Sequence, residues 1–91
     1  GLGDVYKRQV LKVVEPENLI EEARDLAKMM LQGSPYAQAK TKKLVYEGLS
    51  LEASDHVKRS AKELSECFVS EDHQEGVKAF LEKREPRFVG R

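Results

Sequence analysis

The side chains that could take part in chemistry are few and mostly far apart along the chain. His56 and His73 have no Cys, Asp or His partner at the spacing of a metal site, so both are expected at the surface. Cys67 could serve as a nucleophile only with a positioned base and an oxyanion site, and the sequence supplies neither. The favoured interpretation is that Cys67 is a small buried apolar residue. No metal site and no catalytic residue are predicted.

One basic cluster is a candidate for phosphate binding. Lys40, Lys42 and Lys43 lie close together in a stretch predicted to be helical. They could contact phosphates, but a solvated helix face is the favoured interpretation.

Composition restricts the classes of protein that the chain can belong to. Its 91 residues can form one small domain, and 16 basic residues balance 16 acidic ones. Nothing therefore directs the whole chain to nucleic acid or to a membrane. A single Cys excludes an internal disulfide and a Cys-based zinc site, and we expect a reducing, cytoplasmic location. No apolar run approaches the length of a membrane span, and no signal peptide is recognisable.

Five elements are predicted from the order of residues. Residues 10–14 are apolar and mostly β-branched, so they predict a short strand. A helix follows from Pro16 and ends at residues 32–33, with Gly33 in a left-handed cap. Ser34 and Pro35 begin a second helix that ends near Gly48.

Two further helices complete the pattern. Ser50 is expected to cap a third helix, and Ser70 a fourth helix that Pro86 ends. Residues 85–91 are expected to be extended. Each helix has one apolar stripe, as in the third, which carries Val57, Ala61, Leu64 and Phe68. The expected fold is therefore mainly α, with four short amphipathic helices after a short N-terminal strand.

The last 22 residues, together with a run in the middle of the chain, resemble the C-terminus of the enoyl-CoA hydratase/isomerase (crotonase) family. The matching positions are Glu15-Pro16-Glu17-Asn18-Leu19, Leu26-Ala27, Ser34-Pro35, Ala37, Thr41-Lys42, Ser70-Glu71-Asp72, Glu75-Gly76, Ala79-Phe80, Glu82-Lys83-Arg84, Pro86, Phe88 and Gly90-Arg91. The resemblance covers residues 10–91. Residues 1–9 match neither the family nor any periodic pattern, and we interpret them as a non-native or disordered leader.

The resemblance implies a helical C-terminal segment of a crotonase-like α+β fold, a ββα spiral whose core is missing. Such enzymes hydrate 2-enoyl-CoA or shift its double bond through an enolate held by two backbone N–H groups, with one or two glutamates as acid and base. In the family these groups lie upstream. The carboxylates Glu63, Glu66, Glu71 and Glu75 would have no enolate site to serve, so no catalytic residue is assigned.

The resemblance also implies a ligand. Coenzyme A would bind as part of the substrate, with no covalently bound cofactor, and Lys83 matches a basic position that meets the CoA phosphates in some members. The alternative is a solvated lysine at a helix C-terminus. Arg84 is a weaker candidate because it points elsewhere on the helix. Leu64 matches an adenine-contacting aromatic position, but core packing is the favoured role for a leucine.

The remaining expectations concern packing. Phe68, Phe80 and Phe88 are interpreted as packing residues, and Gly76, inside a helix, as a point where another backbone approaches closely. The resemblance implies a homo-trimer or hexamer built through the helical segment. The rival hypothesis is an independent all-helical interaction module with no CoA role.

Overall fold

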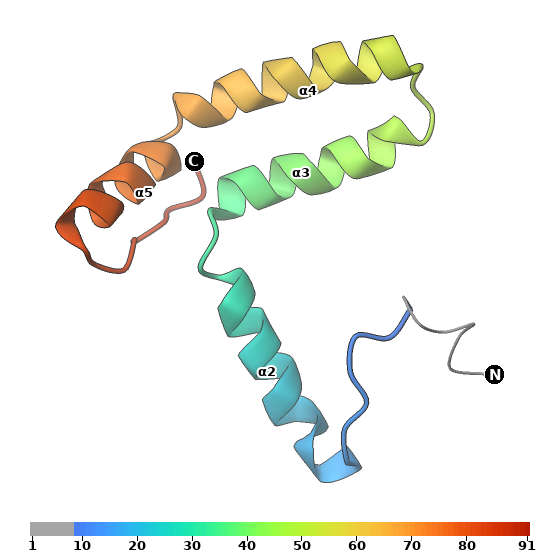
Figure 1. Ribbon diagram of the computed structural model, residues 1–91, viewed down its shortest axis with the longest axis vertical. Helices are drawn as coiled ribbons and strands as arrows, with labels where there is room; N and C mark the ends of the chain where they lie inside the picture. Colours follow the sequence, from blue (N-terminus) through green and yellow to red (C-terminus); the bar gives the residue numbers. More distant parts are fainter. Residues whose placement is uncertain (1–8) are drawn as a thin grey trace. The chain divides into compact units, whose positions relative to one another are not determined.

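The chain is mainly helical, as expected. The computed structural model describes residues 9–91, which form one 3-10 turn and four α-helices (Figure 1). Residues 1–8 of the predicted leader lie outside the described residues. The chain divides into two compact units, one ending at Met30 and the other spanning Leu31–Arg91.

The first unit contains the 3-10 turn η1 (Pro16–Asn18) and helix α2 (Leu19–Met30). The strand predicted for residues 10–14 is wrong, because these residues adopt no regular structure. A strand is held by backbone hydrogen bonds to a neighbour, and no second strand exists among residues 9–91. This segment is instead tied to α2 by an ion pair between Lys12 and Glu22, 2.7 Å apart.

Helix α2 ends earlier than its sequence pattern predicts. Its last residue is Met30, and the chain passes through a turn before the next helix. The left-handed cap expected at Gly33 is absent, since the described residues with positive φ are Lys83 and Gly90. The apolar stripe of this helix extends to Met30, but the sequence pattern did not show that the helix ends there.

The second unit begins with two antiparallel helices that lie side by side, α3 (Pro35–Gly48) and α4 (Ala53–Phe68) (Figure 1). Ser34 caps α3 as predicted, and its hydroxyl accepts from the amide of Ala37 at 3.2 Å. The cap predicted at Ser50 is wrong, because α4 begins at Ala53 with Glu52 in the cap position and no side-chain cap bond. The Ser50 hydroxyl instead donates to the carbonyl of Glu47 at 3.3 Å.

Helix α5 (Glu71–Glu82) follows a short turn and is capped by Ser70, whose hydroxyl accepts from the His73 amide at 3.1 Å. The helix ends before Pro86, as predicted. The tail 85–91 has no regular structure, and it returns alongside α5 so that the Asp72 amide donates to the carbonyl of Arg91 at 2.9 Å (Figure 1).

Apolar burial is slight in both units. Ala79 is the one buried apolar residue among residues 9–91, whereas the other buried residues, Glu63, Ser70 and Asp72, are polar. Most side chains of the predicted apolar stripes are largely exposed, including Leu19, Met30, Val57, Leu64, Phe68, Val77, Phe80 and Leu81. The positions of the helices in the second unit are therefore set mainly by polar contacts.

Candidate functional site

Lys83, the residue expected to contact coenzyme A, lies at the C-terminal end of α5 in an unusual backbone conformation. Its φ of 55° and ψ of 46° are left-handed, a region that glycine normally fills. The Lys83 amide donates to the carbonyl of Phe80 at 3.3 Å, and the Arg84 amide donates to that of Ala79 at 3.0 Å. This pair of bonds is the Schellman motif, which satisfies the last carbonyls of a helix.

Arg84 fixes the residues around Lys83. Its guanidinium forms two parallel bonds to the Glu75 carboxylate, at 2.6 and 3.2 Å, and a third to Glu82 at 2.6 Å. The Glu75 carboxylate also accepts from the Arg87 amide at 2.9 Å. The bonds from Arg84, and then the bond from the Arg87 amide, lower the pKa of Glu75 to about 2. The same pairing, first with Glu75 and then with Glu82, raises the pKa of Arg84.

A second carboxylate, Asp72, holds the end of the tail. It is 1% exposed and accepts from the amide of Val89 at 2.7 Å, from that of Gly90 at 3.1 Å and from the Ser34 hydroxyl at 2.7 Å. Burial disfavours its charged form, but the bonds from Val89, Ser34 and Gly90 outweigh burial and lower its pKa. Asp72 therefore joins the starts of α3 and α5 to the tail.

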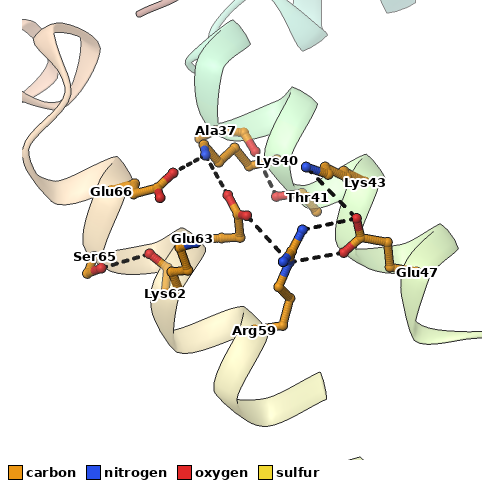
Figure 2. Close-up of polar contacts among 10 residues, drawn as sticks. All are labelled: Ala37, Lys40, Thr41, Lys43, Glu47, Arg59, Lys62, Glu63, Ser65 and Glu66. Atoms are coloured by element: carbon orange, nitrogen blue, oxygen red, sulfur yellow. Dashed lines mark hydrogen bonds and ion pairs between the residues drawn. The ribbon is translucent and has the colours of Figure 1, made fainter. Parts of the chain in front are cut away.

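Two carboxylates of α4 pair with one lysine of the basic cluster on α3 (Figure 2). Lys40 donates to both Glu63 and Glu66, so its expected place on a solvated face is wrong. Hydrogen bonds to Glu63 and then Glu66 raise the pKa of Lys40, and its bond lowers the pKa of Glu63 against the effect of burial. Helical spacing could not show this contact, because the partners lie 23 and 26 residues away.

Arg59 continues this network toward the other end of the helix pair (Figure 2). Its Nε lies 3.2 Å from Glu47 and 3.7 Å from Glu63, and Lys43 lies 3.9 Å from Glu47. The charges of the two helices are thus matched across their interface. The cluster is therefore a structural contact between α3 and α4.

The histidines differ from each other. The Nε2 of His56 donates to the carbonyl of Leu44 at 3.0 Å, so this residue bridges α3 and α4 and is half-buried, contrary to the surface position expected. His73 is exposed as expected, and its ring meets that of Phe68 edge-on, with centroids 5.1 Å apart. Cys67 is half-buried. No three His, Cys, Asp or Glu side chains of residues 9–91 are grouped to hold a metal ion.

The residues expected to pack differ in how far the described residues cover them. Leu64 and Phe68 are each 58% exposed, and Phe80 is 82% exposed, so the packing expected of them is not made within residues 9–91. Phe88 is half-buried and does pack, over Gly76. The neighbour of Gly76 is that ring and not a backbone, and a Cβ there would meet Phe88 at an ordinary 3.6 Å.

Sequence reasoning missed Asp72 as a structural centre. In the sequence it stands out only as part of the run Ser70-Glu71-Asp72 that matches the family. No pattern in the sequence indicates its contacts, because Val89, Gly90 and Ser34 lie 17, 18 and 38 residues away. No helix in the part of the chain described is both long and apolar enough to cross a membrane.

Comparison with known proteins matches the resemblance seen in the sequence. The model of the enoyl-CoA hydratase/isomerase family matches residues 9–91. A probable enoyl-CoA hydratase of Bacillus subtilis is 40% identical over 79% of this chain and 28% of its own length. The crotonyl-CoA hydratase of Syntrophomonas wolfei is 33% identical over 90% of this chain and 32% of its own length.

Solved structures agree with these relatives. The crystal structure of a probable enoyl-CoA hydratase/isomerase from Mycobacterium abscessus superposes with a TM-score of 0.83 at 33% identity, covering 90% of this chain and 32% of that one. A structure from Mycobacterium paratuberculosis gives 0.81 at 26% identity, covering 97% of this chain and 35% of that one. The chain spans about a third of the length of these proteins. It belongs to the enoyl-CoA hydratase/isomerase family.

Proposed function

We propose that the chain is the helical C-terminal part of a longer cytoplasmic enzyme that acts on acyl-CoA thioesters. The enzyme would hydrate a 2-enoyl-CoA or shift its double bond through an enolate held by backbone N–H groups, with CoA bound as part of the substrate. The observation that carries this is the family match over residues 9–91, joined by relatives named as hydratases of crotonyl-CoA and short-chain enoyl-CoA. The rival, an independent helical module, explains neither finding.

The catalytic groups are assigned to the rest of that enzyme. The four carboxylates considered for acid–base chemistry are already paired: Glu63 and Glu66 with Lys40, Glu71 with Arg91 and Glu75 with Arg84. A general acid or base must reach the proton that it moves. The 91-residue chain should therefore leave crotonyl-CoA unchanged, followed by absorbance of the enoyl thioester. Turnover above buffer in protein free of host hydratase would refute this assignment.

Within the segment, Lys83 is proposed to contact the phosphate end of CoA. It is exposed and makes no ion pair among residues 9–91, although Glu82 and Glu85 flank it. An ammonium is a suitable point-charge partner for phosphate. Its left-handed backbone supports a role beyond the helix end, since strained residues tend to cluster at functional sites.

This role predicts a binding defect without a chemical one. In the longer enzyme, Lys83→Ala should raise KM for a CoA substrate about twofold to a hundredfold, the range of a screened to a well-formed charge contact. The value of kcat should stay nearly constant, because a remote phosphate contact stabilises ground and transition states equally. Lys78→Ala, on an exposed position of the same helix, is the matched control. A pantetheine thioester without the nucleotide should respond to neither change.

The segment is also proposed to serve oligomer packing in a trimer or hexamer. The support is the exposure of large apolar side chains such as Val77, Phe80 and Leu81 on α5, since patches of this kind mark association sites. Sedimentation of the longer enzyme tests this: Phe80→Glu should shift the oligomer toward smaller species, and Lys78→Glu should not. If Phe80→Glu leaves the size of the oligomer unchanged, Phe80 does not lie in the subunit interface.

A further inference from the structure

The turn that carries Lys83 is held from both sides by one pair of residues. Arg84, the next residue, reaches back to Glu75 near the middle of α5, and Glu75 also accepts from the amide of Arg87. Residues 84 and 87 are thus both bonded to the same carboxylate of α5. A residue other than glycine resists the left-handed conformation of Lys83, and the contacts of Glu75 add to the Schellman bonds of the Lys83 and Arg84 amides in holding it.

The same pair determines which charge at the helix end stays unpaired. Two carboxylates lie within two residues of Lys83 in sequence, Glu82 and Glu85, and Glu75 lies earlier on the same helix. Arg84 binds Glu82 and Glu75, with Nε to Glu82 at 2.6 Å and the two terminal nitrogens to Glu75. Without Arg84, the carboxylate of Glu82, the residue next to Lys83, would lose its ion pair and could attract the Lys83 ammonium instead.

We propose that the Glu75–Arg84 pair is a positioning device for Lys83, which fixes its left-handed turn and keeps its ammonium available for the phosphate of a CoA thioester. The proposal rests on the phosphate role of Lys83 given above. It adds two residues that touch no ligand and act only through Lys83. Their fork-shaped, two-bond geometry cannot be reproduced by a lysine at position 84, which presents a single charged nitrogen.

The test is a double-mutant cycle in the longer enzyme, with Glu75→Gln, Lys83→Ala and both together. Glu75→Gln keeps the shape and an oxygen acceptor for the Arg87 amide but loses the charge. It should raise KM for the CoA substrate about three- to tenfold, with kcat within twofold and the pantetheine thioester unaffected. In the Lys83→Ala background the same change should add nothing, since coupled residues fail to act additively. Arg84→Lys should lie between the wild type and Glu75→Gln.

A second measurement reports the turn without any ligand. Trypsin cleaves after Lys83 and Arg84 only when the turn opens, so Glu75→Gln should speed cleavage there about three- to tenfold, as read by mass spectrometry. The matched control is Glu71→Gln, one turn earlier on α5, whose carboxylate pairs with Arg91 at 3.1 Å. It should change neither KM nor cleavage after Lys83.

The outcomes separate the two proposals. If Lys83→Ala raises KM but Glu75→Gln does not, or if Glu75→Gln has the same effect in both backgrounds, the positioning role is refuted while the phosphate role stands. If Lys83→Ala leaves KM unchanged, the phosphate role is refuted and the positioning role with it. Unchanged cleavage in Glu75→Gln would show that the pair does not hold the turn.

Discussion

Replacing Asp72 with Asn tests whether this carboxylate holds the tail to the helices. Asp72 is 1% exposed, and its two oxygens face the amides of Val89 and Gly90 and the Ser34 hydroxyl. Whichever oxygen becomes an amide nitrogen, at least one N–H donor would face another N–H. A hydrogen bond to a charged group contributes about 1.5–3 kcal/mol, so we expect the tail to lose about 2–3 kcal/mol of local stability.

Amide hydrogen exchange at Val89 and Gly90 measures that loss directly. At about 1.4 kcal/mol for each tenfold change, protection of these two amides should fall about 30- to 150-fold. The matched control is Asp55→Asn, an exposed acid in the first turn of α4, where only the helix-dipole contribution of about 0.3–1 kcal/mol is lost. If Asp72→Asn lowers the protection of these amides no more than Asp55→Asn does, Asp72 does not hold the tail.

Three further predictions concern two glycines, the Glu75 carboxylate and the exposed apolar side chains. Gly76→Ala should stabilise the chain by about 1 kcal/mol, because alanine favours a helix over glycine and the added Cβ would meet Phe88 at an ordinary 3.6 Å. Gly48→Ala should not stabilise the chain, because its Cβ would lie 2.9 Å from the His56 ring. Urea unfolding compares the two variants. Glu75 has a folded pKa of about 2 against 4.5, so its stabilising contribution is complete above pH 4.5 and is lost as the pH falls toward 2; the melting temperature should drop over that range, less steeply in Glu75→Gln. The 91-residue chain should self-associate or melt at low temperature, since its large apolar side chains are exposed; a sedimenting monomer with a sharp, high-temperature transition would contradict this.

Part of the local structure was predictable from the sequence: two helix caps are confirmed, whereas the caps expected at Gly33 and Ser50 are wrong. The caps at Ser34 and Ser70 were predicted because each hydroxyl meets an amide three residues on. The strand at residues 10–14 was wrong because a strand depends on a partner that neighbouring residues cannot specify. Apolar stripes identified the helices, yet they gave no information on which faces the chain itself would cover.

The polar contacts that hold the candidate site together join residues that lie far apart in the sequence. Asp72 meets Ser34 across 38 positions and Gly90 across 18, and Lys40 meets Glu66 across 26. The sequence showed three nearby lysines with similar chemistry, and only the pairing of α3 with α4 distinguished Lys40 from the others. Lys83 was identified from the resemblance, but its left-handed backbone could not be predicted, because propensity favours glycine there.

In the second unit, the buried side chains are mostly polar and the large apolar side chains are mostly exposed. Charged groups that are buried must be paired and hydrogen-bonded, and such contacts tolerate few alternative geometries. Glu63 and Asp72 satisfy this requirement, so they fix α3, α4, α5 and the tail without an apolar core. The apolar faces of the same helices then contribute little to their arrangement within the described residues. A substitution such as Phe80→Glu should therefore leave the fold of this unit nearly unchanged, while Asp72→Asn, which alters a single atom, should loosen it.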